Sequence, residues 1–224
     1  MMEANSVFED VSERRSSILS RIEAARASGE RLDPVHLVAV SKVQPDERID
    51  AALRTGHRVF GENRVQEAKS RWAARRVDYP DLQLRLIGPL QTNKAALACD
   101  LFDVIESLDR AKLARALAAR ENPPPCLIQV NTGLETQKAG VLPEEFDELL
   151  GEARALGLSV EGLMCIPPID EAPGPHFAYL AKMAESHGLE VLSMGMSADF
   201  ETAITFGATH VRIGSAFFGA RQPA

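Results

Sequence analysis

The sequence predicts an α/β barrel, and three observations lead to this fold class. Eight short apolar runs recur along the 224 residues, separated by segments with helical periodicity or helix-start signals. The runs are almost continuously apolar, as parallel strands buried on both faces require. Single α/β barrel domains commonly contain roughly 200–250 residues, which suits a chain of this length. The expected strands are residues 36–42, 58–63, 84–90, 104–108, 126–131, 160–166, 190–196 and 210–215.

An extra amphipathic helix is expected before the first strand, over residues 7–28. Its apolar side consists of Val7, Val11, Ile18 and Ile22, and Gly29 can end it. Such a helix is placed to cover the barrel where no long helix follows the eighth strand. We therefore expect one domain over residues 1–224, with a covering helix in residues 1–30 and the barrel in residues 36–221.

Helix signals follow the predicted strands. After the first strand, Pro45 and the two acidic residues behind it favour a helix start, and Gly56 can end that helix. Similar patterns predict helices over residues 142–157, 176–188 and 197–207, each ending at a glycine shortly before the next strand. The repeated order of strand, loop and helix indicates parallel strands joined by helical crossovers.

One structural alternative is a doubly wound open sheet. That fold usually has a glycine-rich GxGxxG turn after its first strand, whereas here residues 41–45 read SKVQP. No linker, low-complexity segment or charge block divides the chain, and Pro123, Pro124 and Pro125 form a rigid connector. These features favour the closed barrel.

Composition excludes several classes of function. The net charge is −7 and the 25 basic residues are scattered, so no basic stripe is expected for nucleic acid or an anionic membrane. No apolar stretch approaches the ~18–20 residues that span a bilayer, and the first residues do not resemble a secretory signal. Cys99, Cys126 and Cys165 are isolated among apolar neighbours, which favours buried thiols over disulfides or a zinc site. We expect a cytoplasmic protein without nucleic acid, membrane or metal partners.

Lys42 is the first candidate for chemistry. In an α/β barrel the functional residues lie at the carboxyl ends of the strands, where the first apolar run ends in this lysine. Burial disfavours the charged amine, which lowers its pKa and makes it a nucleophile toward a carbonyl. From position alone, a lysine that reaches solvent or pairs with Glu62 is an equal alternative. The same rule also selects Glu62, Asn63, Gly88, Asn131, Cys165, Ser193, Gly195, Ser197, Arg212, Gly214 and Ser215.

The last two predicted strands end in residues suited to a phosphate. Gly195 and Ser197 follow the seventh strand, Gly214 and Ser215 end the eighth, and the corresponding loops of this fold frequently bind phosphate. Glycine lets the backbone approach an anion, serine donates hydrogen bonds, and a helix beginning near Ser197 adds its positive end. The alternative is that these are ordinary turn and cap residues. Arg212 is expected to face the barrel interior, where it contacts a ring nitrogen or a buried carboxylate.

Six sequence blocks occur in a recognisable order: LVAVSKVQP, VFGENRVQEA, LIGPLQTNK, LIQVNTGLETQKAGV, GLMCIPP and LSMGMSADFETAITFGATHVRIGSAFFG. Together they resemble the pyridoxal phosphate homeostasis protein family, the YggS/PROSC-like proteins, over residues 36–221. The resemblance implies a single barrel of the alanine racemase N-terminal-domain type. It also implies that Lys42 holds pyridoxal 5′-phosphate (PLP) as a covalent aldimine.

The resemblance implies roles for further residues of the cofactor site. They are Asn63 beside the ring and its 3-hydroxyl, Ser197, Gly214 and Ser215 in the phosphate cradle with Ser193 as a further member, and Arg212 on the pyridine nitrogen. An arginine does not readily give up a proton, so the ring nitrogen stays unprotonated and the cofactor is a weaker electron sink. One departure is Arg85, which stands where the family often has a histidine.

The function implied by this resemblance is intracellular PLP (vitamin B6) homeostasis, without strong catalytic activity. Racemisation needs acid and base groups on opposite faces of the substrate, within roughly 2.6–3.2 Å of the transferred proton. A racemase brings its second base, a tyrosine, from a C-terminal β domain that is not expected here. Neither Tyr79 nor Tyr179 lies at a strand end. We expect a monomer that binds PLP and transiently contacts PLP-dependent enzymes.

The sequence leaves two enzymatic alternatives open. The first is a PLP-dependent amino-acid racemase or another PLP enzyme of low activity, because the cofactor itself stabilises carbanions. The second is a barrel enzyme that uses Lys42 on a phosphorylated sugar, as Schiff-base aldolases do.

Overall fold

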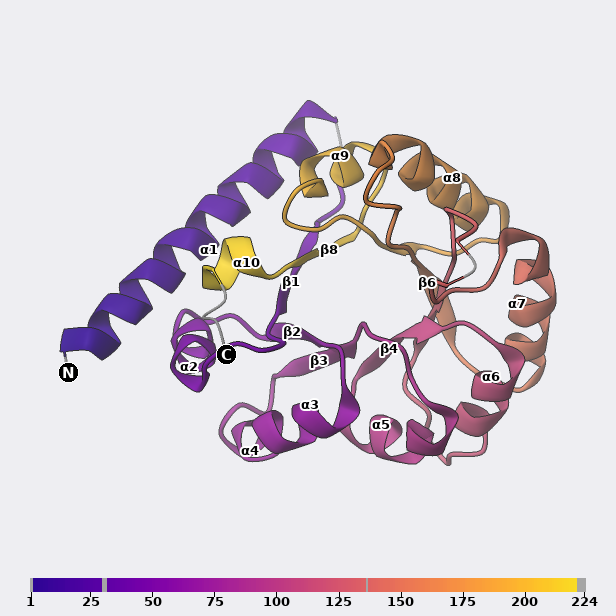
Figure 1. Cartoon of the computed structure of the whole chain (residues 1–224), viewed down its shortest axis with the longest axis horizontal. Helices are drawn as coiled ribbons and strands as arrows, with labels where there is room; N and C mark the ends of the chain where they lie inside the picture. Colours follow the sequence, from indigo (N-terminus) through magenta and orange to yellow (C-terminus); the bar gives the residue numbers. More distant parts are fainter. Residues whose placement is uncertain (1, 30–31, 136, 221–224) are drawn as a thin grey trace.

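The computed structural model describes residues 2–29, 32–135 and 137–220, and it shows a closed barrel of parallel strands ringed by helices (Figure 1). Each strand pairs with the next in chain order, and the eighth pairs with the first. The predicted eight-stranded barrel is confirmed. The strands are β1 (His36–Val40), β2 (Val59–Glu62), β3 (Gln83–Leu86), β4 (Val104–Leu108), β5 (Cys126–Gln129), β6 (Val160–Met164), β7 (Val191–Ser193) and β8 (His210–Ile213).

Helices lie outside the strands and cover the barrel. They are α1 (Met2–Ser28), α2 (Asp46–Arg54), α3 (Val65–Trp72), α4 (Arg75–Asp78), α5 (Ala95–Leu101), α6 (Ala111–Ala118), α7 (Phe146–Ala155), α8 (Pro173–Ser186), α9 (Phe200–Thr205) and α10 (Ser215–Phe218), with 3-10 turns η1 (Thr92–Lys94) and η2 (Pro143–Glu145). None of these described helices is long and apolar enough to cross a membrane.

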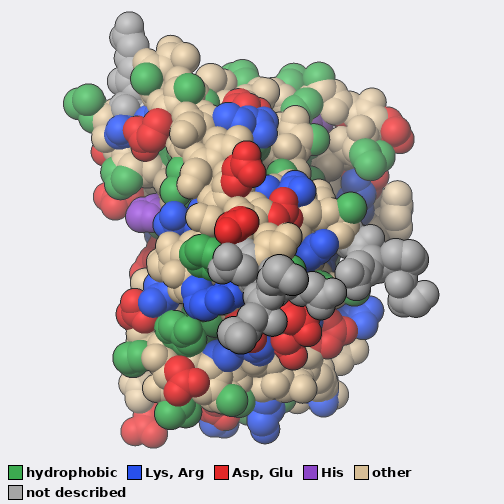
Figure 2. Space-filling model, turned by 90° about the vertical axis from the view of Figure 1, so that its left-hand side faces the viewer, with side chains coloured by type: hydrophobic (Ala, Val, Ile, Leu, Met, Phe, Trp, Pro, Cys, Tyr) green, Lys and Arg blue, Asp and Glu red, His purple; other side chains and the backbone are tan. Residues whose placement is uncertain are grey.

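The expected N-terminal helix is present as α1. Val11, Ile18 and Ile22 are buried, and the helix packs against α2, α9 and α10 (Figure 1). Within the described residues only the single turn of α10 follows β8, so α1 covers the part of the barrel that a full eighth helix would cover in a regular repeat. On the α1 side of the molecule, acidic and basic side chains are interspersed, as the scattered charges of the sequence predicted (Figure 2).

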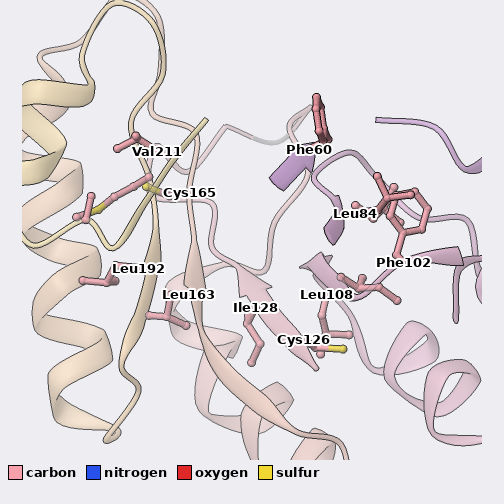
Figure 3. Close-up of a cluster of buried hydrophobic side chains, with 14 of the residues drawn as sticks. Phe60, Leu84, Phe102, Leu108, Cys126, Ile128, Leu163, Cys165, Leu192 and Val211 are labelled. Carbon is pink, nitrogen blue, oxygen red and sulfur yellow. The ribbon is translucent and has the colours of Figure 1, made fainter. Parts of the chain in front are cut away.

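The main hydrophobic core lies between the strands and the helices. Phe60, Leu84 and Leu192 belong to it, and Figure 3 shows how side chains from successive strands contribute to one continuous layer. Strand side chains alternate, so the neighbours of these residues point into the barrel. Arg85 and Ser193 are neighbours of this kind, and both are buried. The interior of the barrel is therefore partly polar, in contrast to the apolar layer around it.

Most strands are shorter than the apolar runs that predict them. The first was expected to extend to Lys42 but ends at Val40, and the seventh was expected over residues 190–196 but ends at Ser193. Hydrogen bonds to the neighbouring strands continue beyond these ends, as from Ser41 N to Gly61 O, but regular pairing stops where the backbone turns into the loops, while the side chains stay buried. Met194, for example, is fully buried outside β7.

Candidate functional site

A cavity of about 270 Å³ opens among the loops at the carboxyl ends of the strands. Six of the seven residues that the sequence nominates as a binding site line it: Lys42, Asn63, Ser197, Arg212, Gly214 and Ser215. The other lining residues are Val40, Ile87, Ile166, Met196 and Ala198, which the sequence did not single out. Positions far apart in the chain thus meet where the fold predicts a functional site.

Lys42 lies in a tight turn after β1, and that turn is anchored to its neighbours. Ser41 Oγ donates to Glu62 Oε1 over 2.7 Å, and Arg71 Nη1 donates to the same oxygen over 2.9 Å and to Ser41 O over 3.1 Å. Trp72 Nε1 adds a third donor to Glu62 Oε1 at 3.0 Å. The buried carboxylate therefore fixes the backbone that carries the lysine.

The residue after the lysine adopts an unusual backbone. Val43 has φ of 60°, a left-handed conformation that costs a β-branched residue on the order of 1–3 kcal/mol. Such strain persists where surrounding contacts impose it, and Arg71, which also donates to Gln44 O, supplies such contacts. The conformation of the Lys42 turn is thus imposed by α3 rather than by local preference.

Asn63 follows β2 and carries an unsatisfied group. Its side-chain Oδ1 is buried and has no hydrogen-bond partner among the described residues. The loop after β3 approaches the backbone of Asn63 closely at Gly88. A Cβ at this glycine would lie 2.3 Å from Asn63 O, so only glycine fits there. A buried acceptor without a donor costs roughly 1–3 kcal/mol. A ligand hydroxyl in the cavity is the type of donor that would satisfy it.

Arg212 is 3% exposed and is held by a polar network that crosses the barrel interior. Its Nη1 donates to Ser193 Oγ and its Nη2 to Cys165 O, both over 2.8 Å. Ser193 Oγ in turn donates to Glu106 Oε2 over 2.5 Å, and Arg85 Nε donates to Glu106 Oε1. Because these residues come from β3, β4, β7 and β8, the network fixes the guanidinium from several directions.

The network keeps Glu106 ionised. Burial acts to raise the pKa of this carboxyl, but Arg85, Arg212 and the Ser193 hydrogen bond outweigh it and lower the pKa below its ordinary value. Burial lowers the pKa of Arg212, with Glu106 acting in the opposite direction. An arginine stays protonated at any physiological pH. The cavity therefore has a permanent cation in its wall.

Ser193 differs from the other nominated residues because it does not line the cavity. Its hydroxyl is fully buried between Glu106 and Arg212, so it supports the arginine instead of facing the hollow. Glu106 and Arg85 were missed as partners because the strand-end rule considers only the last residues of each run. A charged residue inside the apolar run VIESL was the signal that could have revealed Glu106.

The loop after β7 departs from the expected helix start. The helix was expected from Ser197, but α9 begins at Phe200, and Asp199 Oδ1 accepts from Met196 N over 2.6 Å to shape the intervening turn. Gly195 has φ of 88°, and a Cβ there would lie 2.5 Å from Ala203 Cβ, so packing requires this glycine. Ser197 therefore lies in a turn, and the positive end of a helix that was expected to begin there is not formed at this residue.

Gly214 is a different case. A Cβ at this position would lie 3.6 Å from Val40, which is an ordinary contact, and φ is −107°. Neither packing nor a left-handed backbone requires a glycine here. Its absence of a side chain leaves the backbone beside Ser215 open to the cavity, which is what an approaching anion needs.

Two other residues nominated by the strand-end rule serve the fold. Asn131 Nδ2 donates to Glu135 O over 2.8 Å, and Asn131 Oδ1 accepts from Glu135 N, which closes the loop after β5. Cys165 contributes its carbonyl to Arg212, and burial raises the pKa of its thiol to about 12. Cys126 is likewise buried with a raised pKa, so the prediction of buried thiols is confirmed for both.

Comparison with known sequences gives consistent matches. The chain matches the family "Alanine racemase, N-terminal domain" over residues 17–222. The pyridoxal phosphate homeostasis protein of Pseudomonas aeruginosa is 41% identical over 95% of this chain and 96% of its own length. The protein of the same name from Escherichia coli K12 is 36% identical over 95% of this chain and 97% of its own length.

Solved structures agree with this relationship. PipY of Synechococcus elongatus with PLP bound has a TM-score of 0.78 and 35% identity, over 93% of this chain and all of that one. Alanine racemase from Corynebacterium glutamicum has a TM-score of 0.67 and 20% identity, and the match covers 97% of this chain but 62% of the racemase. The second similarity shows a shared barrel fold.

Proposed function

The chain belongs to the pyridoxal phosphate homeostasis protein family, which shares the alanine racemase N-terminal domain, and on this premise we propose that it binds PLP at the carboxyl ends of its strands. Its role is intracellular homeostasis of this cofactor. The observation that carries the proposal is the convergence of six residues nominated from the sequence on one cavity. The PLP bound to PipY supports it from a relative.

The residues present fit this cofactor. PLP has a hydroxyl, an aldehyde, a ring nitrogen and a phosphate, and the cavity offers a complement to each. Asn63 Oδ1 is a buried acceptor that has no donor among the described residues, as a ring hydroxyl would provide. Ser197 and Ser215 supply hydroxyl donors, and Gly214 leaves the backbone beside them accessible to a phosphate.

Lys42 is proposed as the covalent anchor. Its amine would hold the cofactor by condensing with the aldehyde, with the aldehyde oxygen released as water. The anchored turn of Ser41 and Glu62 holds the lysine backbone in place during this step. When bound, PLP supplies an aldehyde conjugated to an electron-withdrawing ring.

Arg212 is proposed to face the ring nitrogen. A guanidinium can only donate a hydrogen bond, so it favours an unprotonated nitrogen and weakens the withdrawal of electrons by the ring. Ser193 and Glu106 hold it in that orientation. This arrangement suits storage of the cofactor better than catalysis by it.

The two tyrosines support the same conclusion. Tyr79 follows α4 and lies under the Arg58 guanidinium, 4.8 Å from it, while Tyr179 lies on α8 and is 44% exposed. Neither lines the cavity, so neither is placed as the second proton-transfer group of a racemase. We propose binding without substantial amino-acid turnover, in a cytoplasmic monomer that contacts PLP-dependent enzymes transiently.

The test is spectroscopic. Purified protein with added PLP should show a visible absorbance band, and borohydride should remove this band while it fixes the pyridoxyl group on Lys42. Lys42→Ala should show neither the band nor the label. Lys69→Ala is the matched control, since this lysine is exposed on α3, and it should behave as wild type. A label on a different lysine would refute the anchor. Racemisation of alanine or serine well above the level of Lys42→Ala would favour the enzymatic alternative.

A further inference from the structure

A second hollow lies beside the proposed cofactor cavity. It has a volume of about 500 Å³ and is formed by the loops that follow β2 and β3. Asn63 lines both hollows, so the two adjoin at this residue. The volume falls within the roughly 300–1,000 Å³ that small-molecule sites occupy. We call it the basic groove, defined by Asn63, Arg64, Gln66, Gln91 and Lys94.

The side chains of the basic groove carry one sign of charge. Arg64 and Lys94 approach it from different loops, Gln66 and Gln91 add amide groups, and no aspartate or glutamate is among its lining residues. The whole chain has a net charge of −7, so a hollow of this composition opposes the average charge of the molecule. The negative net charge of the molecule opposes the approach of an anion, so any affinity for one would have to come from contacts inside the groove.

Both cations are available to a ligand. Among the described residues Lys94 forms no ion pair. Arg64 pairs with Glu67 over 2.9 Å, but the arginine side chain is 76% exposed, and exposed pairs of this kind are weak. A bound anion can replace Glu67 as the partner of Arg64 at little cost.

The groove is also held in shape. Arg110 Nη2 donates to Leu90 O over 2.8 Å and to Thr92 Oγ1 over 3.2 Å, which fixes the loop between β3 and η1. Gly88 brings the start of that loop against the backbone of Asn63. Gln91 and Lys94 therefore project from an ordered segment, and a ligand need not order it.

We propose that the basic groove binds a small dianion beside the cofactor site. Two separated cations and several amide groups match a molecule with two carboxylates or one dianionic phosphate, which present the same chemistry to the protein. The inference goes beyond the proposed function, because the groove is a separate site. It shares only one lining residue, Asn63, with the PLP cavity.

Calorimetric titration with succinate and with inorganic phosphate tests the proposal and distinguishes the two anion classes, with acetate as the monoanion. Wild type, Arg64→Gln, Lys94→Gln and Lys69→Gln are compared. We expect a dianion to bind wild type and Lys69→Gln alike, to bind each groove variant at least about tenfold more weakly, and to exceed acetate by a similar factor. Binding of either dianion with this dependence supports the proposal and identifies the class.

Absence of binding by both dianions, or equal weakening in Lys69→Gln, would overturn it. The titration is repeated on protein saturated with PLP, which fills the cofactor cavity, and the dianion should bind this protein as it binds the cofactor-free one. A loss of dianion binding in the saturated protein would place the anion in the PLP cavity and refute the groove. The visible absorbance with added PLP, recorded on the same variants, reports the cofactor site separately, so failure of one proposal is distinguishable from failure of the other.

Discussion

Single residues in the barrel interior determine how Arg212 faces the cavity. Glu106 is 0% exposed and serves two cations, because it pairs directly with Arg85 and reaches Arg212 through Ser193. One carboxylate between two guanidinium groups leaves the cluster with a positive charge. An anionic ligand in the cavity above it would therefore be favoured, and Arg85 contributes a permanent part of that charge.

The first prediction concerns this cluster. Glu106→Gln leaves both arginines without their carboxylate and should destabilise the cofactor-free protein by about 3–5 kcal/mol, as breaking a buried ion pair does. Arg85→Met should reduce the free energy of unfolding by less, because Glu106 still interacts with Arg212 through Ser193. The double variant should be more stable than the sum of the single effects implies. Urea unfolding of the four proteins measures this, and effects that add within about 0.5 kcal/mol would contradict the coupling.

A second residue-scale prediction concerns pH. His57 is buried between Phe60 and Phe217, and desolvation lowers its pKa from 6.5 to about 4. Its folded-state pKa lies below the unfolded one, so the stability it contributes is complete above pH 6.5 and is lost as the pH falls toward about 4. The loss should approach about 3 kcal/mol. His57→Gln should flatten the stability curve in this window, and a variant with the wild-type slope would contradict the assignment.

At the scale of elements, the sequence allowed the order and number of strands to be predicted because buried parallel strands and their crossover helices have distinct periodicities. The ends of elements were less predictable, since burial continues past the last residue of a regular strand, as at Met194. The pairing of Arg85 with Glu106 had no local signal, because it depends on the register of β3 with β4. Lys42 and Arg212 could be nominated since each ends or nearly ends an apolar run.

Helix α1 gives a prediction for an element. Ile22 is 1% exposed in its contact with the barrel helices, whereas Arg21 on the same helix forms an exposed ion pair with Glu201 over 2.8 Å. Ile22→Ala should reduce the free energy of unfolding by about 2–5 kcal/mol because it leaves a cavity. Arg21→Gln, the control, should cost less than about 1 kcal/mol. Urea denaturation of both variants measures these changes. Equal losses of unfolding free energy would show that the apolar side of α1 does not hold the helix on the barrel.

For the whole molecule, cofactor binding should raise thermal stability. A ligand that binds only the folded state at about 100 times its Kd adds about 2.7 kcal/mol. In a domain of 150–250 residues this corresponds to a rise in Tm of roughly 5–10 °C. Differential scanning fluorimetry with PLP should show this rise for wild type and a much smaller one for Lys42→Ala. A rise of the same size in both would mean that PLP stabilises the protein without this lysine.

Closure of the barrel also has a consequence for biosynthesis. β1 pairs with β8 through His36 and His210, so the first strand finds its second neighbour only after nearly the whole chain exists. β8 also provides Arg212, and Gly214 follows it directly. Contacts between such distant segments form late and slowly. A chain still emerging from the ribosome therefore has Lys42 but lacks Arg212 and Gly214 of the proposed cofactor site, and it should acquire PLP only after its synthesis has passed β8.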